Sequence, residues 1–160
     1  MAEDKKPPLL SVQNLIIEFA TENGVVRATD NISFDIFANE TVGIVGESGC
    51  GKTVTGLSIL GLIPSPPGRI VGGSITFMGR ELVGLPEEEM RKIRGCHISM
   101  IFQEPMTALN PVFSIGNQMT DVLIRHHGLT RRQARDSAIE MLAKVGGKYG
   151  MPVVTEGLRS

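Results

Sequence analysis

One run of eight residues, GESGCGKT, restricts what this chain can fold into more than any other part of the sequence. It fits the pattern GxxxxGK[ST], in which glycines let successive backbone N–H groups turn inward around an anion that a Cβ atom would obstruct. The pattern predicts a phosphate-binding loop between a strand and the amino end of a helix. Its members are Gly46, Glu47, Ser48, Gly49, Cys50, Gly51, Lys52 and Thr53.

The segments on either side of the loop have the composition that the pattern requires. Residues 41–45, TVGIV, form a short apolar run that predicts a buried parallel strand. From Lys52 onward, KTVTGLSILGLI is apolar on nearly all sides and predicts a buried helix that ends at the PSPP run. Lys52 would then reach the β- and γ-phosphates of a nucleotide, and Thr53 would offer its hydroxyl to Mg²⁺. The plainer alternative, a glycine-rich turn with a solvated lysine, leaves the flanking strand and helix patterns unexplained.

Two other glycine motifs overlap the loop, and neither is complete. A dinucleotide-binding GxGxxG that starts at Gly49 needs glycine where the chain has Val54. A nucleophile elbow GxSxG that starts at Gly46 needs glycine where the chain has Cys50. The run is therefore interpreted as a phosphate loop, or Walker A motif, rather than as either of these.

Composition and charge exclude several other classes of protein. Apolar residues make up 41% and charged residues 21% of the 160 residues, which is typical of a soluble globular domain. The net charge of −1 argues against a dedicated nucleic-acid-binding protein, which usually carries a basic face. Cys50 and Cys96 form no CxxC pair, so neither a disulfide framework nor a zinc site is indicated. The leader MAEDKKPPLL is no signal peptide and no apolar run is long enough to cross a bilayer, so we expect a cytoplasmic chain.

The remaining sequence predicts a mixture of strands and helices. Strands are expected at residues 9–19, 25–28, 31–37, 74–78 and 97–102, with a hairpin turn at residues 22–24. Helices are expected from Pro86 and over residues 114–127 and 130–145, the last with a capping box formed by Thr130 and Gln133. This order indicates an α/β or α+β fold with a helical appendage.

Two stretches of the sequence carry a resemblance to a known family. VGESGCGKT, followed by IRGCHISMIFQEPMTALNPVFSIGNQ, resembles the ATP-binding subunits of ABC transporters, and among them the oligopeptide, dipeptide and nickel importers. The resemblance implies that residues 1–145 are the N-terminal portion of an ABC nucleotide-binding domain and that residues 146–160 are a divergent tail. The implied fold class is α/β, a P-loop NTPase core with an antiparallel β-subdomain and part of a helical subdomain, truncated.

The resemblance also implies cofactors and further site residues. ATP and Mg²⁺ are the cofactors, and Gln103 matches the catalytic Q-loop glutamine, which touches Mg²⁺ and the attacking water and senses the membrane subunit. Taken without the surrounding match, Gln103 is a polar residue at the end of a strand. The family stacks adenine on an aromatic residue of its antiparallel sheet, for which Phe19 is the best positional match. The alternatives are stacking by the guanidinium of Arg27 and a plain core role for Phe19.

Several motifs of the intact family are missing from the 160 residues. The signature LSGGQ is absent, no apolar run followed by Asp-Glu comes after Gln103, and no histidine follows His127. The chain is therefore expected to be an incomplete ABC-type ATPase subunit, inactive alone, whose intact relatives couple ATP binding and hydrolysis to uptake of peptides or related solutes. The alternative is a non-hydrolysing nucleotide-binding or interaction fragment. A GTPase or small-molecule kinase is disfavoured, because the chain has no NKxD motif and such a function leaves the FQEP stretch unexplained.

The expected partners follow from the same resemblance. They are ATP, transmembrane permease subunits and a second ATP-binding subunit, with no nucleic acid and no transmembrane segment in the chain itself. The implied location is peripheral, at the cytoplasmic face of the cell membrane. A basic run in the helical region is either a solvated face or part of the surface that meets the membrane subunit. It consists of Arg125, His126, His127, Arg131, Arg132 and Arg135.

Overall fold

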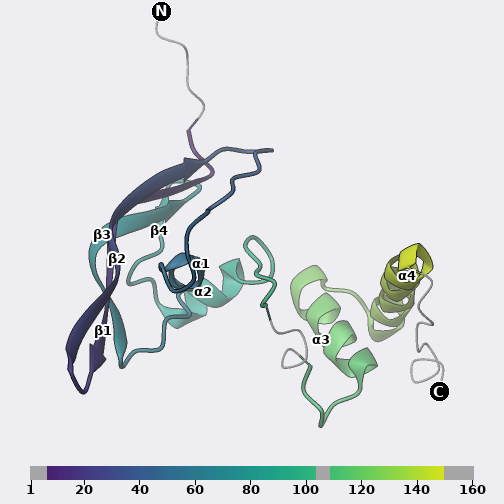
Figure 1. Cartoon of the computed structure of the whole chain (residues 1–160). Coiled ribbons are helices and arrows are strands. Elements are labelled where there is room, and N and C mark those ends of the chain that lie inside the picture. The colour runs from purple at the N-terminus through teal and green to yellow at the C-terminus, as the bar shows by residue number, and fades with distance from the viewer. Residues whose placement is uncertain (1–6, 104–108, 150–160) are drawn as a thin grey trace, which may run out of the picture. The chain divides into compact units, whose positions relative to one another are not determined.

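The computed structural model describes residues 7–103 and 109–149, and the side chains of the last helix as far as residue 145. The chain divides into two compact units, Met1–Ser99 and Met100–Ser160. The first unit holds the strands and two short helices, and the second holds two longer helices (Figure 1). The phosphate loop belongs to the first unit, whereas Gln103 belongs to the second.

A β-hairpin opens the first unit. β1 (Leu10–Thr21) pairs antiparallel with β2 (Gly24–Ile36) through a turn at the ENG run, which confirms the predicted hairpin. The prediction of two separate strands at residues 25–28 and 31–37 is wrong, because β2 runs through both segments without a break.

Bulges explain how β2 stays continuous. Asn14 and Asn31 have positive φ angles of 50° and 56° and lie close to shifts in the register between the two strands. Asparagine tolerates this left-handed conformation better than most residues, so the strand bends there instead of ending. Beyond the bulge, alternate side chains of β2 are half-buried against the core, as the alternating pattern predicts. These are Ile32, Phe34 and Ile36.

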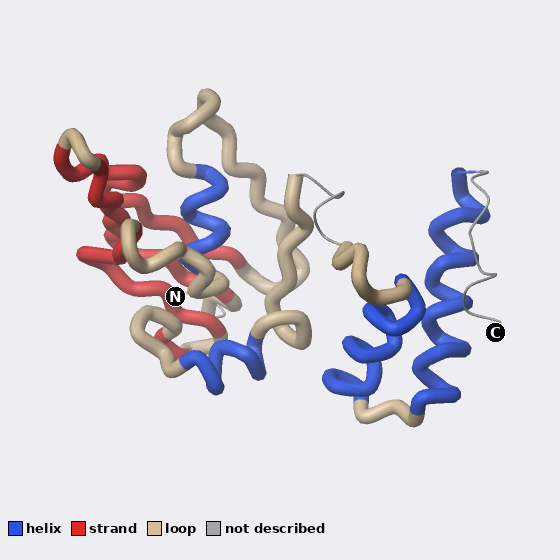
Figure 2. Tube along the Cα trace, turned by 90° about the horizontal axis from the view of Figure 1, so that it is seen from below, coloured by secondary structure: helices blue, strands red, loops and turns tan. Residues whose placement is uncertain are grey.

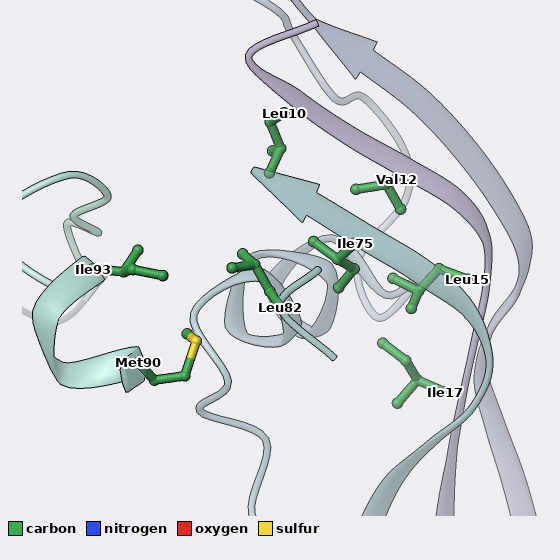
Figure 3. Packing of buried hydrophobic residues seen from close by; sticks show 8 residues of the cluster. All are labelled: Leu10, Val12, Leu15, Ile17, Ile75, Leu82, Met90 and Ile93. Carbon is green, nitrogen blue, oxygen red and sulfur yellow. The ribbon is translucent and has the colours of Figure 1, made fainter. Parts of the chain in front are cut away.

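The hairpin belongs to a four-stranded antiparallel sheet with the order β2-β1-β3-β4. β3 (Gly68–Phe77) starts well before the predicted residue 74, and β4 (Arg80–Glu81) is a short edge strand. The inner strands β1 and β3 supply the side chains at the centre of the core, which Figure 3 shows. The largest fully buried ones are Val12, Leu15, Ile17 and Ile75.

A short helix completes this core. α2 (Glu87–Ile93) starts one residue later than predicted, with Pro86 as its N-cap, and has acidic residues in its first turn and basic residues in its last. Its side chains Met90 and Ile93 are buried in the same cluster as Leu82, so α2 is fixed to the sheet by apolar packing (Figure 3).

α1 (Lys52–Ile59) begins where the motif predicts, but it is shorter and less buried than the sequence predicts. It ends ahead of Gly61, whose φ of +60° is a left-handed conformation that terminates helices, and so it never reaches the PSPP run. Thr55 and Ser58 are the buried residues of this helix.

The predicted buried strand at residues 41–45 is wrong for this structure. The segment has no strand geometry, and Val42, Ile44 and Val45 are 39%, 51% and 93% exposed. A parallel strand forms only against a hydrogen-bonded neighbour, and the described residues place no strand beside this run. Its apolar side chains therefore stay in contact with water.

The predicted strand at residues 97–102 is also wrong. The segment has no strand geometry: one isolated parallel bridge joins Arg94 and Ile98, and Ile101 is 97% exposed. A strand forms only against a hydrogen-bonded neighbour, and the sheet of the described residues does not include this segment.

The second unit contains two helices that lie side by side, joined by a short loop (Figure 2). α3 (Ile115–His127) is capped by Ser114, whose hydroxyl accepts a hydrogen bond from the N–H of Asn117 at 3.2 Å. Gly128 ends the helix with a φ of +63°. Both ends agree with the prediction.

α4 (Arg131–Tyr149) begins with the predicted capping box. The N–H of Thr130 donates to the Gln133 carboxamide at 3.0 Å, and the N–H of Gln133 donates to the Thr130 hydroxyl at 3.4 Å. The helix continues past the predicted end at residue 145, where Val145 is 66% exposed. The buried contacts between the helices come from Leu123, Ala134 and Ala138.

We predict that the exposed run at residues 41–45 makes the chain self-associate. Apolar side chains beside unpaired backbone groups act as a template for pairing with another chain. Val45→Lys places a charge in this run and is expected to increase the monomer fraction across a concentration series in sedimentation velocity.

Thr41→Lys is the matched control, because it adds the same charge to the same segment without removing an apolar side chain. It is expected to increase the monomer fraction less than Val45→Lys does. Identical monomer fractions for the unsubstituted chain and for Val45→Lys would show that the run does not drive association.

Candidate functional site, a phosphate loop at the start of α1

The turn that leads into α1 is shaped by two glycines in the left-handed region. Gly49 has a φ of +83°, and Gly51, which forms the N-cap of α1, has a φ of +90°. A Cβ atom on Gly51 would lie 2.4 Å from the carbonyl oxygen of Ala28 in β2. Only glycine therefore allows the loop to approach the sheet this closely.

Lys52 folds back over the loop that precedes it. Its Nζ donates to the carbonyl oxygens of Gly46 at 2.7 Å and Glu47 at 2.6 Å, and it lies 3.4 Å from Sγ of Cys50. These bonds hold a positive charge across the loop.

The amino end of α1 is open to an anion. Thr53 is exposed in the first turn, that turn contains no acidic residue, and no side chain in the described part of the chain caps the helix. The first N–H groups of a helix have no partner within it, and the helix dipole places partial positive charge there. Both features favour a bound phosphate.

The available space also fits this chemistry. A Cβ atom on Gly46 would lie 2.5 Å from Sγ of Cys50, so a side chain there would displace the thiol. A Cβ atom on Gly49 would meet nothing within 4 Å, so the need for glycine at that position comes from its φ angle. The eight residues predicted from the motif thus form one turn that leads into α1, with the ammonium group of Lys52 folded over it.

Gln103 lies in the second unit, and its predicted neighbours in the motif, residues 104–108, lie outside the described residues. Gln103 is exposed and follows a segment without strand geometry, so its interpretation as a polar strand end is wrong. Its role as a contact of Mg²⁺ and of the attacking water stays a prediction from the motif.

Phe19 is half-buried on β1 and packs against the core cluster of the sheet. It pairs with Gly68 on β3, where a Cβ atom would lie 2.7 Å from Cε1 of the ring. This packing supports the core role that the sequence left open. Arg27 is held by ion pairs with Asp30 at 2.9 Å and Glu18 at 3.2 Å. Adenine stacking by either residue stays a prediction.

The structure adds one contributor to the site that the sequence did not reveal. The carbonyl oxygen of Ala28 and the buried side chain of Thr29 form the surface against which Gly51 rests. Because the closest contact is made by a backbone carbonyl, the type of residue at position 28 does not reveal it in the sequence.

The basic run of the helical unit is largely exposed, which favours a solvated face. Two of its members, Arg125 and His126, line a cavity of about 620 Å³ together with Asp121, Val122 and Ile124. A role in binding a membrane subunit stays a prediction.

The antiparallel sheet, the loop and the helix that follows it define a phosphate-loop protein. The family model described as ABC transporter matches residues 29–156, and the chain belongs to this family. The resemblance inferred from the sequence is therefore confirmed.

Curated relatives name the group within the family. The dipeptide transport ATP-binding protein DppD of Bacillus subtilis is 49% identical over 138 residues, which cover 86% of this chain and 41% of that protein. The oligopeptide transport ATP-binding protein OppD of Escherichia coli is 44% identical over 145 residues, which cover 91% of this chain and 42% of that protein. The chain thus spans less than half the length of these relatives.

A solved structure supports the fold. The dimeric structure of MJ0796, described as a bacterial ABC transporter cassette, matches with a TM-score of 0.72 and 23% identity, over 83% of this chain and 55% of that one. The predicted fold class, part of an ABC nucleotide-binding domain, is confirmed by this likeness.

We predict that a maleimide labels Cys50 faster than Cys96 and that Mg·ATP slows the labelling of Cys50. Both thiols are exposed, but Cys50 lies beside the ammonium group of Lys52 near a helix amino end, where thiols are more reactive. Mass spectrometry of the two single-cysteine variants, Cys50→Ser and Cys96→Ser, measures each rate separately. Equal rates that nucleotide does not alter would contradict the prediction.

Proposed function

We propose that this chain is the ATP-binding part of an ABC importer subunit for peptides or related solutes. The observation that carries the proposal is the loop at the start of α1, in which Lys52 donates hydrogen bonds to the carbonyl oxygens of Gly46 and Glu47. The names of the curated relatives, dipeptide and oligopeptide transport ATP-binding proteins, supply the substrate class.

The residues of the loop divide the work of holding a nucleotide. The backbone N–H groups of residues 46–51 and the first turn of α1 would bind the phosphates, with Lys52 neutralising the terminal ones. Thr53 would offer its exposed hydroxyl to Mg²⁺, and the match to the Q-loop motif assigns Gln103 a contact with Mg²⁺ and the attacking water. Phosphoryl transfer in such sites depends on positioning and on electrostatic stabilisation, which these groups provide.

We propose that residues 1–145 are the N-terminal portion of the nucleotide-binding domain and that residues 146–160 are a divergent tail. The 160 residues contain neither LSGGQ nor an Asp-Glu pair after an apolar run beyond Gln103, and no histidine follows His127. A chain without these groups lacks the carboxylates that hold Mg²⁺ and activate water. It is therefore proposed to bind nucleotide without hydrolysing it.

Transmembrane permease subunits and a second ATP-binding subunit are the proposed partners, at the cytoplasmic face of the cell membrane. The relatives' names, all of transport ATP-binding proteins, support this assignment. Among the described residues, no helix is long and apolar enough to cross a membrane.

A second function has support from the missing motifs. The same chain could act as a non-hydrolysing fragment that binds nucleotide and contacts a permease without powering it. Both functions predict that the 160 residues release no phosphate on their own, so phosphate release by this chain would exclude the non-hydrolysing fragment.

We predict that the chain binds Mg·ATP, that Lys52→Ala weakens binding about tenfold or more, and that neither protein releases phosphate. The loss follows from removing the charge that faces the phosphates, since truncating one partner of a close charge pair costs about 2–5 kcal/mol. Isothermal titration and a phosphate-release assay measure the two properties.

Lys144→Ala is the matched control, because Lys144 is an exposed lysine of α4 that pairs with Glu140 at 2.7 Å. Its binding should equal that of the unsubstituted chain. Phosphate release that disappears in Lys52→Ala would overturn the proposed inactivity, and equal binding by Lys52→Ala would overturn the nucleotide site.

A further inference from the structure

Arg94, the residue that follows α2, joins that helix to the far end of α1. Its Nε donates to the carbonyl oxygen of Leu60 at 2.6 Å, and its Nη2 donates to that of Gly61 at 3.0 Å. Its Nη1 donates to Oε1 of Glu87 at 2.8 Å. The guanidinium fork thus bonds two elements at once, and its side chain is only 20% exposed.

The bonds from Arg94 complete the carboxyl end of α1. The N–H groups of Gly61 and Leu62 bond back to the carbonyl oxygens of Ser58 and Leu57 at 3.0 and 2.8 Å, in a Schellman motif. The carbonyl groups that follow have no partner in this motif, and they accept the hydrogen bonds of Arg94 instead. The positive fork also faces the negative end of the helix dipole, which stabilises it.

Side-chain packing also holds α1. Its buried side chains are the small Thr55 and Ser58, while Val54 and Ile59 are partly buried against the core. A helix of eight residues is roughly 12 Å long and moves as a stiff rod. A displacement at its carboxyl end is therefore passed to the amino end, where Lys52 lies.

We propose that Arg94 is a positioning residue for the phosphate loop. By holding the carboxyl end of α1, it sets where Lys52 and the first N–H groups of the helix stand. This inference rests on the proposed nucleotide-binding function.

Glu87 keeps the fork in place. The hydrogen bond from Arg94 lowers the pKa of the Glu87 carboxyl, and a second bond from Arg91 at 3.3 Å acts in the same direction. The carboxylate therefore stays ionised at neutral pH and orients the guanidinium toward α1. The sequence shows Arg94 only as one of several basic residues near the end of α2.

The test compares Arg94→Ala, Arg94→Lys and Arg91→Ala in the 160-residue chain. Arg91→Ala is the matched control, because Arg91 bonds the same carboxylate of Glu87 but is 73% exposed on α2. Each variant is assayed for its Mg·ATP dissociation constant and for hydrogen exchange of the backbone amides at residues 55–62. Circular dichroism verifies that secondary structure is kept.

Arg94→Ala is expected to raise the dissociation constant roughly tenfold. This factor corresponds to the upper part of the range of free energies found for a charge at a helix end. It should also speed exchange at residues 55–62 without changing exchange in β1. For both measurements, Arg94→Lys should give values between those of the unsubstituted chain and of Arg94→Ala, because an ammonium group keeps the charge but loses the planar fork of donors. Arg91→Ala should change neither measurement.

An unchanged dissociation constant with unchanged exchange in Arg94→Ala would overturn the inference, as would equal effects of Arg91→Ala. If Arg94→Ala does not fold, Arg94→Lys decides by the same two measurements. If the unsubstituted chain shows no Lys52-dependent binding, the proposed function fails, and with it the nucleotide part of the inference. The exchange comparison then still decides whether Arg94 holds α1.

Discussion

The place of the phosphate loop depends on a close approach between Gly51 and the backbone of β2. A side chain at position 51 would clash with the carbonyl oxygen of Ala28, because a Cβ atom there would lie 2.4 Å from that oxygen. Next to this contact, Thr29 is buried and its hydroxyl donates to the carbonyl oxygen of Leu15 at 3.3 Å. The hairpin thus provides a rigid surface for the amino end of α1. Arg94 holds the opposite end, so the short helix is fixed at both ends.

The fold follows from the sequence wherever neighbours in the chain determine it. The hairpin turn, the start of α2 to within one residue, and the caps at Ser114 and Thr130 depend on residues within a few positions of one another, and all are predicted correctly. The run at residues 41–45 behaves differently. Its pattern is that of a central strand, but such a strand exists only where other segments pair with it.

The candidate site shows the same division. The loop from Gly46 to Thr53 is readable from the sequence, because the residue types are dictated by the backbone geometry that a phosphate needs. Gln103 and Phe19 are indicated only by resemblance to the family, and their roles depend on partners far away in the chain. The role of Arg94 cannot be predicted from the sequence, because its bonds to α1 go to backbone carbonyl groups, which do not depend on residue type.

The bulged hairpin has a consequence for the order in which the chain folds. β1 and β2 are joined by a tight turn, so their contacts close short loops, whereas β3 reaches β1 only after the loop and α1 have been made. Short-range contacts form sooner, because less chain entropy is lost in closing them. During synthesis from the amino end, the two strands can therefore pair before residue 51 has left the ribosome. The part of β2 that contacts Gly51 is then folded before Gly51 leaves the ribosome, and each later element packs on a hairpin that has already formed.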